Sequence, residues 1–518
     1  MPTRRALLAG LALPALRTPA LAQAQPDLLR IAVATEWFAL DPHFHTFPAN
    51  LSMAHHVFDA LTEIDPEGRL LPRLAEEWSP RGSEGWVFRL RGDAKFSDGT
   101  QVTAEDVKAT LARVAAVQTP ARLTIYTRTI ASAEVIDART IFLRTESPDP
   151  FVPRLLSAIY IIQKRFEQAP LAAFNSMEAA IGSGPFRYAG WQRGQGLTLQ
   201  RNDLHWGQKP DWRQVDYRVI TNTAAREAAL LAGDVDFIQS PSTTSVDRLA
   251  GERGLQVARV PSARVTYVQM HQGPEPLADM KTANGRNPFA DARVRRALSL
   301  SIPREAIRER IMGGLSQAAG QIVPPGYDGF NAALGIEPYD LAQAEALLKE
   351  AGWADGFEVT FTTPNDRNVN GVRVVQTIAA ALRRLNIRAE VNAVPLTVQQ
   401  TTWRQGKQSL FMQGAGPLVQ PYLSVVSLTH TKQAARGLGT NNESFFSNAA
   451  LDEVIGKSLV EIDTASRTAL MERAAGLVRE HTAIIPVHHE IIVHAARSTL
   501  KVFARADERI HASEILRA

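Results

Sequence analysis

Cysteine is absent from all 518 residues. This excludes disulfide bonds, a thiol nucleophile and cysteine-ligated metals, and it excludes a lipid-modified cysteine as a membrane anchor. Beyond the N-terminal segment, no apolar run approaches the ~20 residues that a membrane-spanning helix needs. Net charge is small as well, because the formal value of +4 falls to about +1 without the three arginines of residues 1–24. The charge balance therefore gives no indication of nucleic acid as a partner.

The motifs of common enzyme classes are also missing. The chain has no His-Glu-x-x-His, no Gly-x-Ser-x-Gly and no phosphate-binding Walker loop. The sequence therefore predicts a protein that is not an enzyme and that uses no cofactor.

The N-terminal segment has the features of an export signal. Arg4 and Arg5 precede an apolar run over residues 6–16, and small residues flank a cleavage position near residue 24. We expect residues 1–24 to be a signal peptide. The arginine pair is typical of a twin-arginine signal, and a general secretory signal that carries two arginines is the alternative.

Length and pattern predict several α/β domains. A single hydrophobic core does not serve 518 residues, which predicts two or three domains. From residue 339 to 481, helical periods alternate with short apolar strands, the order of a mostly parallel sheet with helices on both faces. In the predicted helix near residue 295, Arg293, Arg295 and Arg296 accompany apolar residues, which predicts a solvated basic face.

Residues 85–114 predict a strand, a tight turn and a capped helix. Apolar residues alternate over 86–90, as in a half-buried strand, and Ser-Asp-Gly at 97–99 suits a turn. Thr103 and Asp106 have the spacing of a capping box. Apolar residues then recur at helical spacing up to residue 114.

As a string, this stretch resembles the segment shared by family 5 extracellular solute-binding proteins, which deliver peptides, nickel and related solutes to ABC importers. Further similar motifs occur at 40–42, 61–78, 182–186 and 287–298. The matching residues of the first segment are Lys95, Phe96, Asp98, Gly99, Thr103, Ala104, Asp106 and Val107.

The resemblance implies an α/β, periplasmic-binding-protein type II-like fold with two lobes, a hinge and an extra domain inserted in the first lobe. We expect the first lobe at 25–58, 180–265 and 486–518, the inserted domain at 59–179 and the second lobe at 266–485. The implied function is capture of a peptide-like or other small organic solute in the interlobe cleft and delivery to permease subunits in the inner membrane. The chain is then a periplasmic monomer without a lipid anchor.

Histidines raise an alternative, because one branch of this family carries nickel. His43 and His45 alternate as metal ligands do, and further histidines occur at 55–56, 488–489 and 494. The alternative function is a metal-chelate binding protein. Solvated surface histidines are the commoner case, so we assign none of them to a metal.

Three segments supply the predicted ligand contacts. Ligands of open α/β sheets lie outside the carboxyl ends of strands, which points to Glu36, Trp37 and Phe38 after the strand at 28–35; the two aromatic residues fit a core position equally well. The resemblance adds the loop at Asn50, Leu51 and Ser52. The segment after the strand at 410–413 contributes Gln413, Gly414, Ala415, Gln420 and Tyr422.

This last segment departs from the pattern of peptide-binding relatives, which have an aspartate here for the peptide ammonium. No acidic residue occurs between Phe411 and Thr429. Since an unpaired buried ammonium is costly, we expect that an unmodified peptide is not held in the usual way, with Glu36 as a replacement carboxylate. The tryptophan of the pattern is also replaced, by Gly414 or Gly416, which opens space for a different or bulkier ligand.

Overall fold

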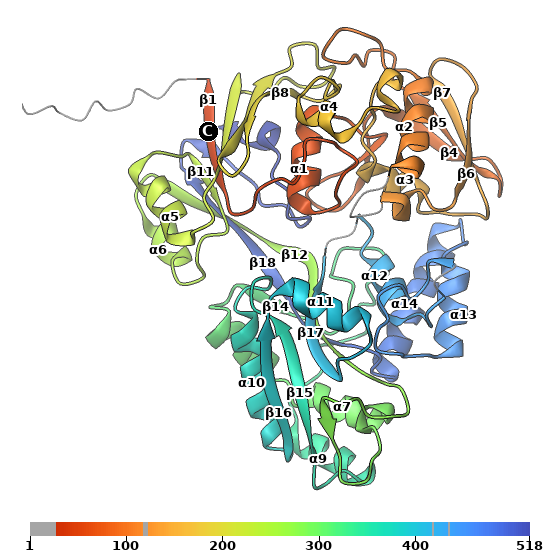
Figure 1. Ribbon diagram of the computed structural model, residues 1–518, viewed down its shortest axis with the longest axis vertical. Coiled ribbons are helices and arrows are strands. Elements are labelled where there is room, and N and C mark those ends of the chain that lie inside the picture. Colours follow the sequence, from red (N-terminus) through yellow and green to blue (C-terminus); the bar gives the residue numbers. More distant parts are fainter. Residues whose placement is uncertain (1–26, 118–122, 417–418, 434–435) are drawn as a thin grey trace, which may run out of the picture.

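A twelve-stranded mixed sheet runs through two lobes. The computed structural model describes residues 27–117, 123–416, 419–433 and 436–518, so the predicted signal peptide lies outside the described residues. Figure 1 shows the lobes one above the other, joined by β12 (Leu255–Met270) and β18 (Ile485–Arg497). Within the described chain, no helix combines the length and apolar character needed to cross a membrane.

The first lobe forms one end of this sheet. Strand β1 pairs parallel with both β10 and β11, and β11 pairs antiparallel with β18. Its core contains Ile31, Phe186 and Phe237. The elements are β1 (Leu28–Val33), α1 (Pro48–Val57), β8 (Phe186–Gln192), β9 (Gly196–Arg201), β10 (Gln214–Val219), α5 (Thr223–Ala232), β11 (Phe237–Gln239), α6 (Val246–Gly251), β19 (Leu500–Lys501) and β20 (Leu516–Arg517).

Residues 59–179 carry a separate four-stranded antiparallel sheet, ordered β4-β5-β7-β6. The predicted strand, turn and helix at 85–114 are present: in strand β5, Phe88 and Leu90 are buried on either side of the exposed Arg89, and the backbone N–H of Thr103 donates to Asp106 Oδ2 at 2.8 Å. The elements are β2 (Thr62–Ile64), β3 (Leu70–Pro72), β4 (Ala75–Pro80), β5 (Gly85–Leu90), α2 (Ala104–Ala116), β6 (Ile130–Val135), β7 (Thr140–Thr145), α3 (Val152–Leu155) and α4 (Leu171–Asn175).

The cap of α2 supports a first prediction. Asp106 also accepts a hydrogen bond from the backbone N–H of Lys164 at 2.8 Å, so its carboxylate joins the helix start to a distant turn. Asp106→Ala is expected to destabilise the protein by about 1–2 kcal/mol, measured by urea unfolding. Glu105→Ala, at an exposed position in the same turn, is the matched control; an equal loss in both variants would contradict the role of the cap.

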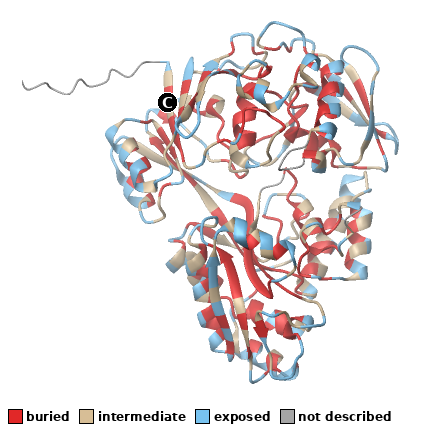
Figure 2. Cartoon of the chain, in the orientation of Figure 1, coloured by how far each residue is buried: buried red, intermediate tan, exposed pale blue. Residues whose placement is uncertain are grey.

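The second lobe forms the other end of the sheet, with β15 parallel to both β16 and β17. Figure 2 shows that buried residues line the interior of both lobes; strand β12 is buried from Ser262 to Met270. The elements are β13 (Met280–Lys281), α7 (Ala292–Leu300), α8 (Arg304–Ala306), β14 (Ser316–Ala318), α9 (Leu341–Glu350), β15 (Phe357–Pro364), α10 (Gly371–Arg383), β16 (Ile387–Val394), α11 (Leu396–Arg404), β17 (Leu410–Ala415), α12 (Tyr422–Thr429), α13 (Ala449–Ser458) and α14 (Thr464–Glu480).

The prediction of a solvated basic face on α7 is wrong for Arg295. Its side chain is buried, and its guanidinium donates to the backbone carbonyls of Phe289, Ala290, His481 and Thr482. Arg295 therefore holds the end of α14 against the start of α7.

The two lobes also meet away from the long strands. Arg154 of the inserted domain donates to the carbonyl of Val419 at 2.6 Å and to that of Gly68 at 2.6 Å. Beside this contact, Phe151 stacks on Tyr422 with 6.5 Å between ring centroids. The inserted domain and helices α12–α14 consequently share one hydrophobic cluster.

Candidate functional site

A cavity of about 210 Å³ lies where the lobes meet on the two long strands. The first lobe contributes the chain after β1 and after β11, and the second contributes the loop after β15 and the chain before β14. The lining residues are Ala34, Thr35, Gln239, Ser240, Pro241, Thr243, Arg264, Met312, Leu315, Arg367, Val369, Glu490, Ile491, Ile492, Val493 and Glu508. Since both lobes build its wall, a solute held here would contact both.

The charged side chains of this wall come from an irregular part of the sheet. The pairing of β12 with β18 shifts register between Pro261 and Val265. Arg264 lies on β12 at this shift, and Glu490 lies on β18 opposite it, next to the pair formed by His489 and Val265. A register irregularity re-aims side chains in this way and is common beside functional sites.

Arg264 is neutralised by Glu508 of the C-terminal segment. Its Nε and Nη2 donate to Oε1 and Oε2 of Glu508, both at 2.7 Å, and Ser262 Oγ donates to Oε1 at 3.0 Å. Burial alone would raise the pKa of Glu508, but Arg264 outweighs burial and lowers it. Glu508 has φ of 63°, a left-handed conformation that costs of order 1 kcal/mol or more in a non-glycine residue.

Glu490 and Arg367 are the other two charges of the cavity. Glu490 is 8% exposed, and burial raises its pKa to about 6, against the opposing effect of Arg264. Its Oε1 accepts a hydrogen bond from the backbone N–H of Val369 at 3.2 Å. Arg367 lies in the same loop as Val369 and is exposed at the mouth of the cavity; partial loss of solvation there, and then the nearby Arg264, lower its pKa.

A layer of buried polar atoms follows along the same face of the sheet. Thr266 pairs with Gly414 on one side and with His488 on the other, so these residues share a face with Arg264 and Glu490. Within the described residues, Thr266 Oγ1 and both ring nitrogens of His488 have no hydrogen-bond partner. Buried polar groups are normally paired with protein, water or ligand. These atoms can therefore form hydrogen bonds with water or with a ligand.

The first group of predicted contacts lies at the edge of the cavity. Ala34 and Thr35 line it, directly before Glu36. The carboxylate of Glu36 instead accepts from the backbone N–H of Gly194 at 2.5 Å. Trp37 is buried in the core against Tyr217, whereas Phe38 is 44% exposed and stacks on His45. Trp37 is therefore a core residue, the alternative given for it above. Ligand contact by Glu36, Trp37 and Phe38 stays a prediction.

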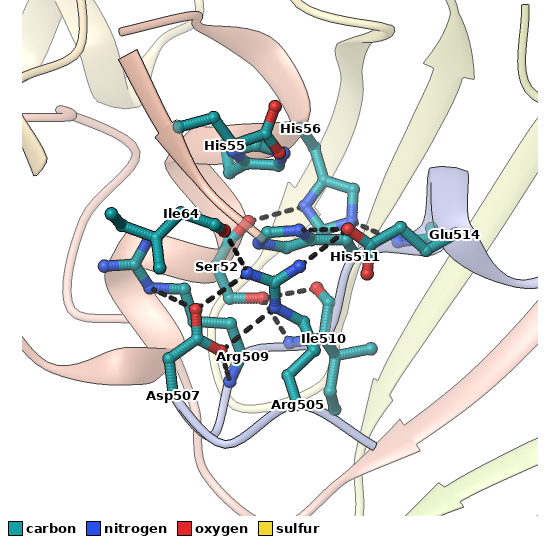
Figure 3. A network of polar contacts seen from close by, with 12 residues as sticks. Ser52, His55, His56, Ile64, Arg505, Asp507, Arg509, Ile510, His511 and Glu514 are labelled. Carbon is teal, nitrogen blue, oxygen red and sulfur yellow. Dashed lines mark hydrogen bonds and ion pairs between the residues drawn. The ribbon is translucent and has the colours of Figure 1, made fainter. Parts of the chain in front are cut away.

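The second predicted group packs against the C-terminal segment. Asn50, Leu51 and Ser52 are all buried in α1, and Ser52 Oγ donates to the carbonyl of Ile510 at 2.5 Å. Figure 3 shows this contact as part of a polar network between α1 and the C-terminal segment. These three residues are not among those lining the interlobe cavity.

The third predicted group lies around the end of β17. An added Cβ at Gly414 would lie 3.1 Å from Asn368 Oδ1 and 3.4 Å from Arg264 Cδ, and one at Gly416 would lie 3.6 Å from the Arg264 guanidinium. These glycines therefore leave room for Arg264. Gln413 and Gln420 are buried, each with one side-chain atom lacking a partner among the described residues, and Ala415 is half-buried.

Tyr422 is buried in the contact between the lobes rather than in the cavity wall. Its hydroxyl is hydrogen-bonded to Ser458 at 2.8 Å. The residue fills the hydrophobic cluster shared by the inserted domain and α12–α14.

The histidine pair proposed for a metal does not form a site. His43 is buried, with Nε2 bonded to the carbonyl of Tyr160 at 2.8 Å and Nδ1 to Arg113 at 2.8 Å, so both nitrogens are engaged. His45 lies between Phe38 and Phe47.

One group of possible ligands occurs elsewhere in the described chain. Nitrogen or oxygen atoms of His55, Glu63 and His511 lie within 4.8 Å of one another. Arg73 and Arg509 line the same small cavity, and their positive charge opposes a cation there.

Sequence reasoning did not identify Arg264, Arg367, Glu490 or Glu508 as site residues. Each is 18 to 123 positions from the next along the chain, and they belong to four different segments. The one available signal was His488-His489-Glu490 on a predicted crossover strand, because a charged residue in an otherwise apolar strand calls for a partner or a ligand.

Comparisons with known proteins agree with this architecture. The chain is 25% identical over 474 residues to the "Probable D,D-dipeptide-binding periplasmic protein DdpA" of Escherichia coli (strain K12), covering 89% of this chain and 88% of that one. Among solved structures it resembles DppA from Helicobacter pylori in complex with the peptide STSA, with a TM-score of 0.76, 21% identity and coverage of 95% and 98%.

A second solved structure is AgaA of A. tumefaciens R10 in complex with agropinic acid, with a TM-score of 0.76, 22% identity and coverage of 95% and 99%. The predicted fold, of the type II periplasmic binding proteins, is confirmed. The model of the bacterial extracellular solute-binding proteins, family 5 Middle, matches residues 69–435. The chain belongs to the family 5 extracellular solute-binding proteins.

Proposed function

We propose that this protein is the periplasmic solute-binding component of an ABC importer for a peptide-like or other small organic solute. The observation that supports this most directly is the charged cavity between the lobes, built on the two strands that join them. A solute that contacts both lobes stabilises the arrangement in which they are together, because it binds that arrangement better than the separated one.

The same proposal covers the setting of the protein. The exported chain is free of a lipid anchor, acts as a monomer and presents its closed form to permease subunits in the inner membrane. It catalyses no reaction: the four charged residues of the cavity form an ion pair and two single charges, an arrangement that suits binding of a charged solute. The metal-chelate alternative has less support, because both nitrogens of His43 are engaged.

A thermal-shift screen tests this function. The mature protein is unfolded and refolded to remove any bound solute, then mixed with dipeptides, tripeptides, N-blocked peptides, N-(carboxyalkyl) amino acids, oligosaccharides and nickel with and without chelators. A solute at about 100 times its Kd stabilises by about 2.7 kcal/mol, and small-angle scattering should show a smaller radius of gyration with that solute. No response to any solute class would contradict the proposal.

A further inference from the structure

Glu490 is the acid of the cavity that is not paired with Arg264, and only one of its two carboxylate oxygens is bound by a described residue. Oε1 of Glu490 accepts from the backbone N–H of Val369 at 3.2 Å, whereas Oε2 accepts no hydrogen bond from any described residue although Glu490 lines the cavity. Glu490 is more than nine-tenths buried. A buried carboxylate in this position is costly unless a cation or a hydrogen-bond donor meets it.

The cations of the cavity differ in how they are satisfied. Two nitrogens of Arg264 are bound by Glu508. Its positive charge is therefore largely neutralised and attracts an anionic ligand only weakly. The guanidinium of Arg367 makes no hydrogen bond or ion pair with any described residue, although its loop forms the cavity wall. Arginine binds carboxylate and phosphate groups through paired N–H donors, so Arg367 is the group available for an anion.

The cavity is also small. Its volume of about 210 Å³ is below the roughly 300–1,000 Å³ of sites for drug-sized ligands. Apolar side chains of Met312, Leu315 and Val493 complete its wall. These features favour a compact solute with two charged ends over a long extended peptide.

We infer that the cleft selects a small zwitterionic solute, whose acid group is bound by Arg367 and whose ammonium group is bound by Glu490. This inference rests on the proposed function and assigns the carboxylate that residues 411–429 lack. The carboxylate of Glu36, the replacement predicted from the sequence, instead accepts a hydrogen bond from Gly194. Amino acid conjugates and dipeptides are the chemical classes that fit.

The electrostatic surroundings of Glu490 give the inference a pH dependence. The charged groups that face it are Arg264 on β12, Arg367 in the loop after β15 and Glu508 in the C-terminal segment, with His488 on its own strand. The pKa of Glu490 is about 6 because of burial. A solute ammonium should therefore bind more weakly as pH falls from 7.5 to 5, where Glu490 becomes neutral.

Isothermal titration with matched probes tests this inference. The panel holds dipeptides and N-(carboxyalkyl) amino acids, each beside its N-acetyl form and its C-terminal amide, together with the uncharged sugars maltose and cellobiose. We expect a zwitterion to bind and both of its modified forms to bind at least tenfold more weakly. Glu490→Gln should weaken the zwitterion at least tenfold and abolish its pH dependence. Arg367→Met should weaken the free acid at least tenfold and leave the affinity for the amide unchanged.

The control is Arg259→Met, an exposed arginine on β12 outside the cavity, which should not alter affinity. Binding of a zwitterion that both Glu490→Gln and Arg367→Met leave within twofold of wild type overturns the inference and leaves the proposed function intact. Tighter binding of maltose or cellobiose than of any zwitterion would also overturn the inference and leave the proposed function intact. Failure of the wild-type protein to bind any member of the panel or of the wider screen overturns the proposed function itself.

Discussion

Asp41→Ala is expected to lower the free energy of unfolding by about 3–5 kcal/mol, because it leaves a buried guanidinium without its carboxylate. Asp41 follows β1, and its two oxygens accept from Arg113 of α2 at 3.0 and 2.6 Å. Arg113 is 1% exposed and Asp41 is 4% exposed. The pair joins the inserted domain to the first lobe.

His43 is the third member of this group. Burial lowers its pKa to about 4, so the imidazole is neutral at pH 7 and its Nδ1 can accept from Arg113. A neutral imidazole cannot replace the negative charge that Asp41 supplies. The decrease in the free energy of unfolding should therefore be large.

Urea unfolding at pH 7 measures the effect. Asp247→Ala is the matched control, since its side chain is 94% exposed and its ion pair with Arg259 lies at the surface; exposed pairs contribute about 0–1 kcal/mol. If the Asp41 variant lost less than about 1 kcal/mol, the buried pair would not stabilise the joint between the domains.

Asp507→Asn is expected to have a comparable effect, again about 3–5 kcal/mol at pH 7. The carboxylate of Asp507 accepts from Arg505 at 3.0 and 2.9 Å, and Arg505 also donates to the carbonyl of Ile64 and to Glu514, each at 2.7 Å (Figure 3). Removing this charge leaves Arg505 buried with only a partial counter-charge.

The effect has a defined dependence on pH. Burial alone would raise the pKa of Asp507, but Arg505 and Arg509 outweigh it and hold that pKa well below its usual value. An acid whose folded-state pKa is lowered stabilises the protein fully above its unfolded pKa of about 3.9 and loses this contribution as pH falls further. The stability difference between wild type and Asp507→Asn should therefore be constant from pH 7 to 5 and shrink below pH 4.

Calorimetric Tm values at several pH values test this expectation. Asp203→Asn serves as the control, because Asp203 pairs with Arg201 at 2.9 Å but its side chain is 69% exposed. A difference that instead grew as the pH was lowered would contradict the assigned sign.

Elements specified by neighbouring residues were predictable from the sequence. The capping interaction of Thr103 with Asp106 needs a spacing of three residues, and the helix α2 that it starts was correctly expected. The antiparallel pair β6 and β7 is also formed by neighbouring segments of the chain. Arg295 was predicted wrongly because two of its partners, His481 and Thr482, lie almost two hundred positions away.

The site was not predictable in the same way. Gly414 and Gly416 were predicted to open space for a ligand, but the neighbouring side chain in the structure is that of Arg264, which the sequence does not show. The ion pair of Arg264 with Glu508 joins residues that are 244 positions apart, and only the crossing of β12 and β18 brings them together. Local patterns therefore identify the scaffold, whereas the polar groups that recognise a solute depend on how distant strands meet.

The position of Arg264 and Glu490 at the register shift of β12 and β18 has a mechanical consequence. In a rotation of the lobes about the two strands that join them, a solute bound there lies close to the axis, where each lobe moves least. The outer contacts, such as Arg154 with Val419, lie farther from that axis and travel a proportionately longer arc for the same rotation. A displacement too small to disturb the solute is thus magnified at the rims, the part of the closed form that would meet the permease in the proposed function.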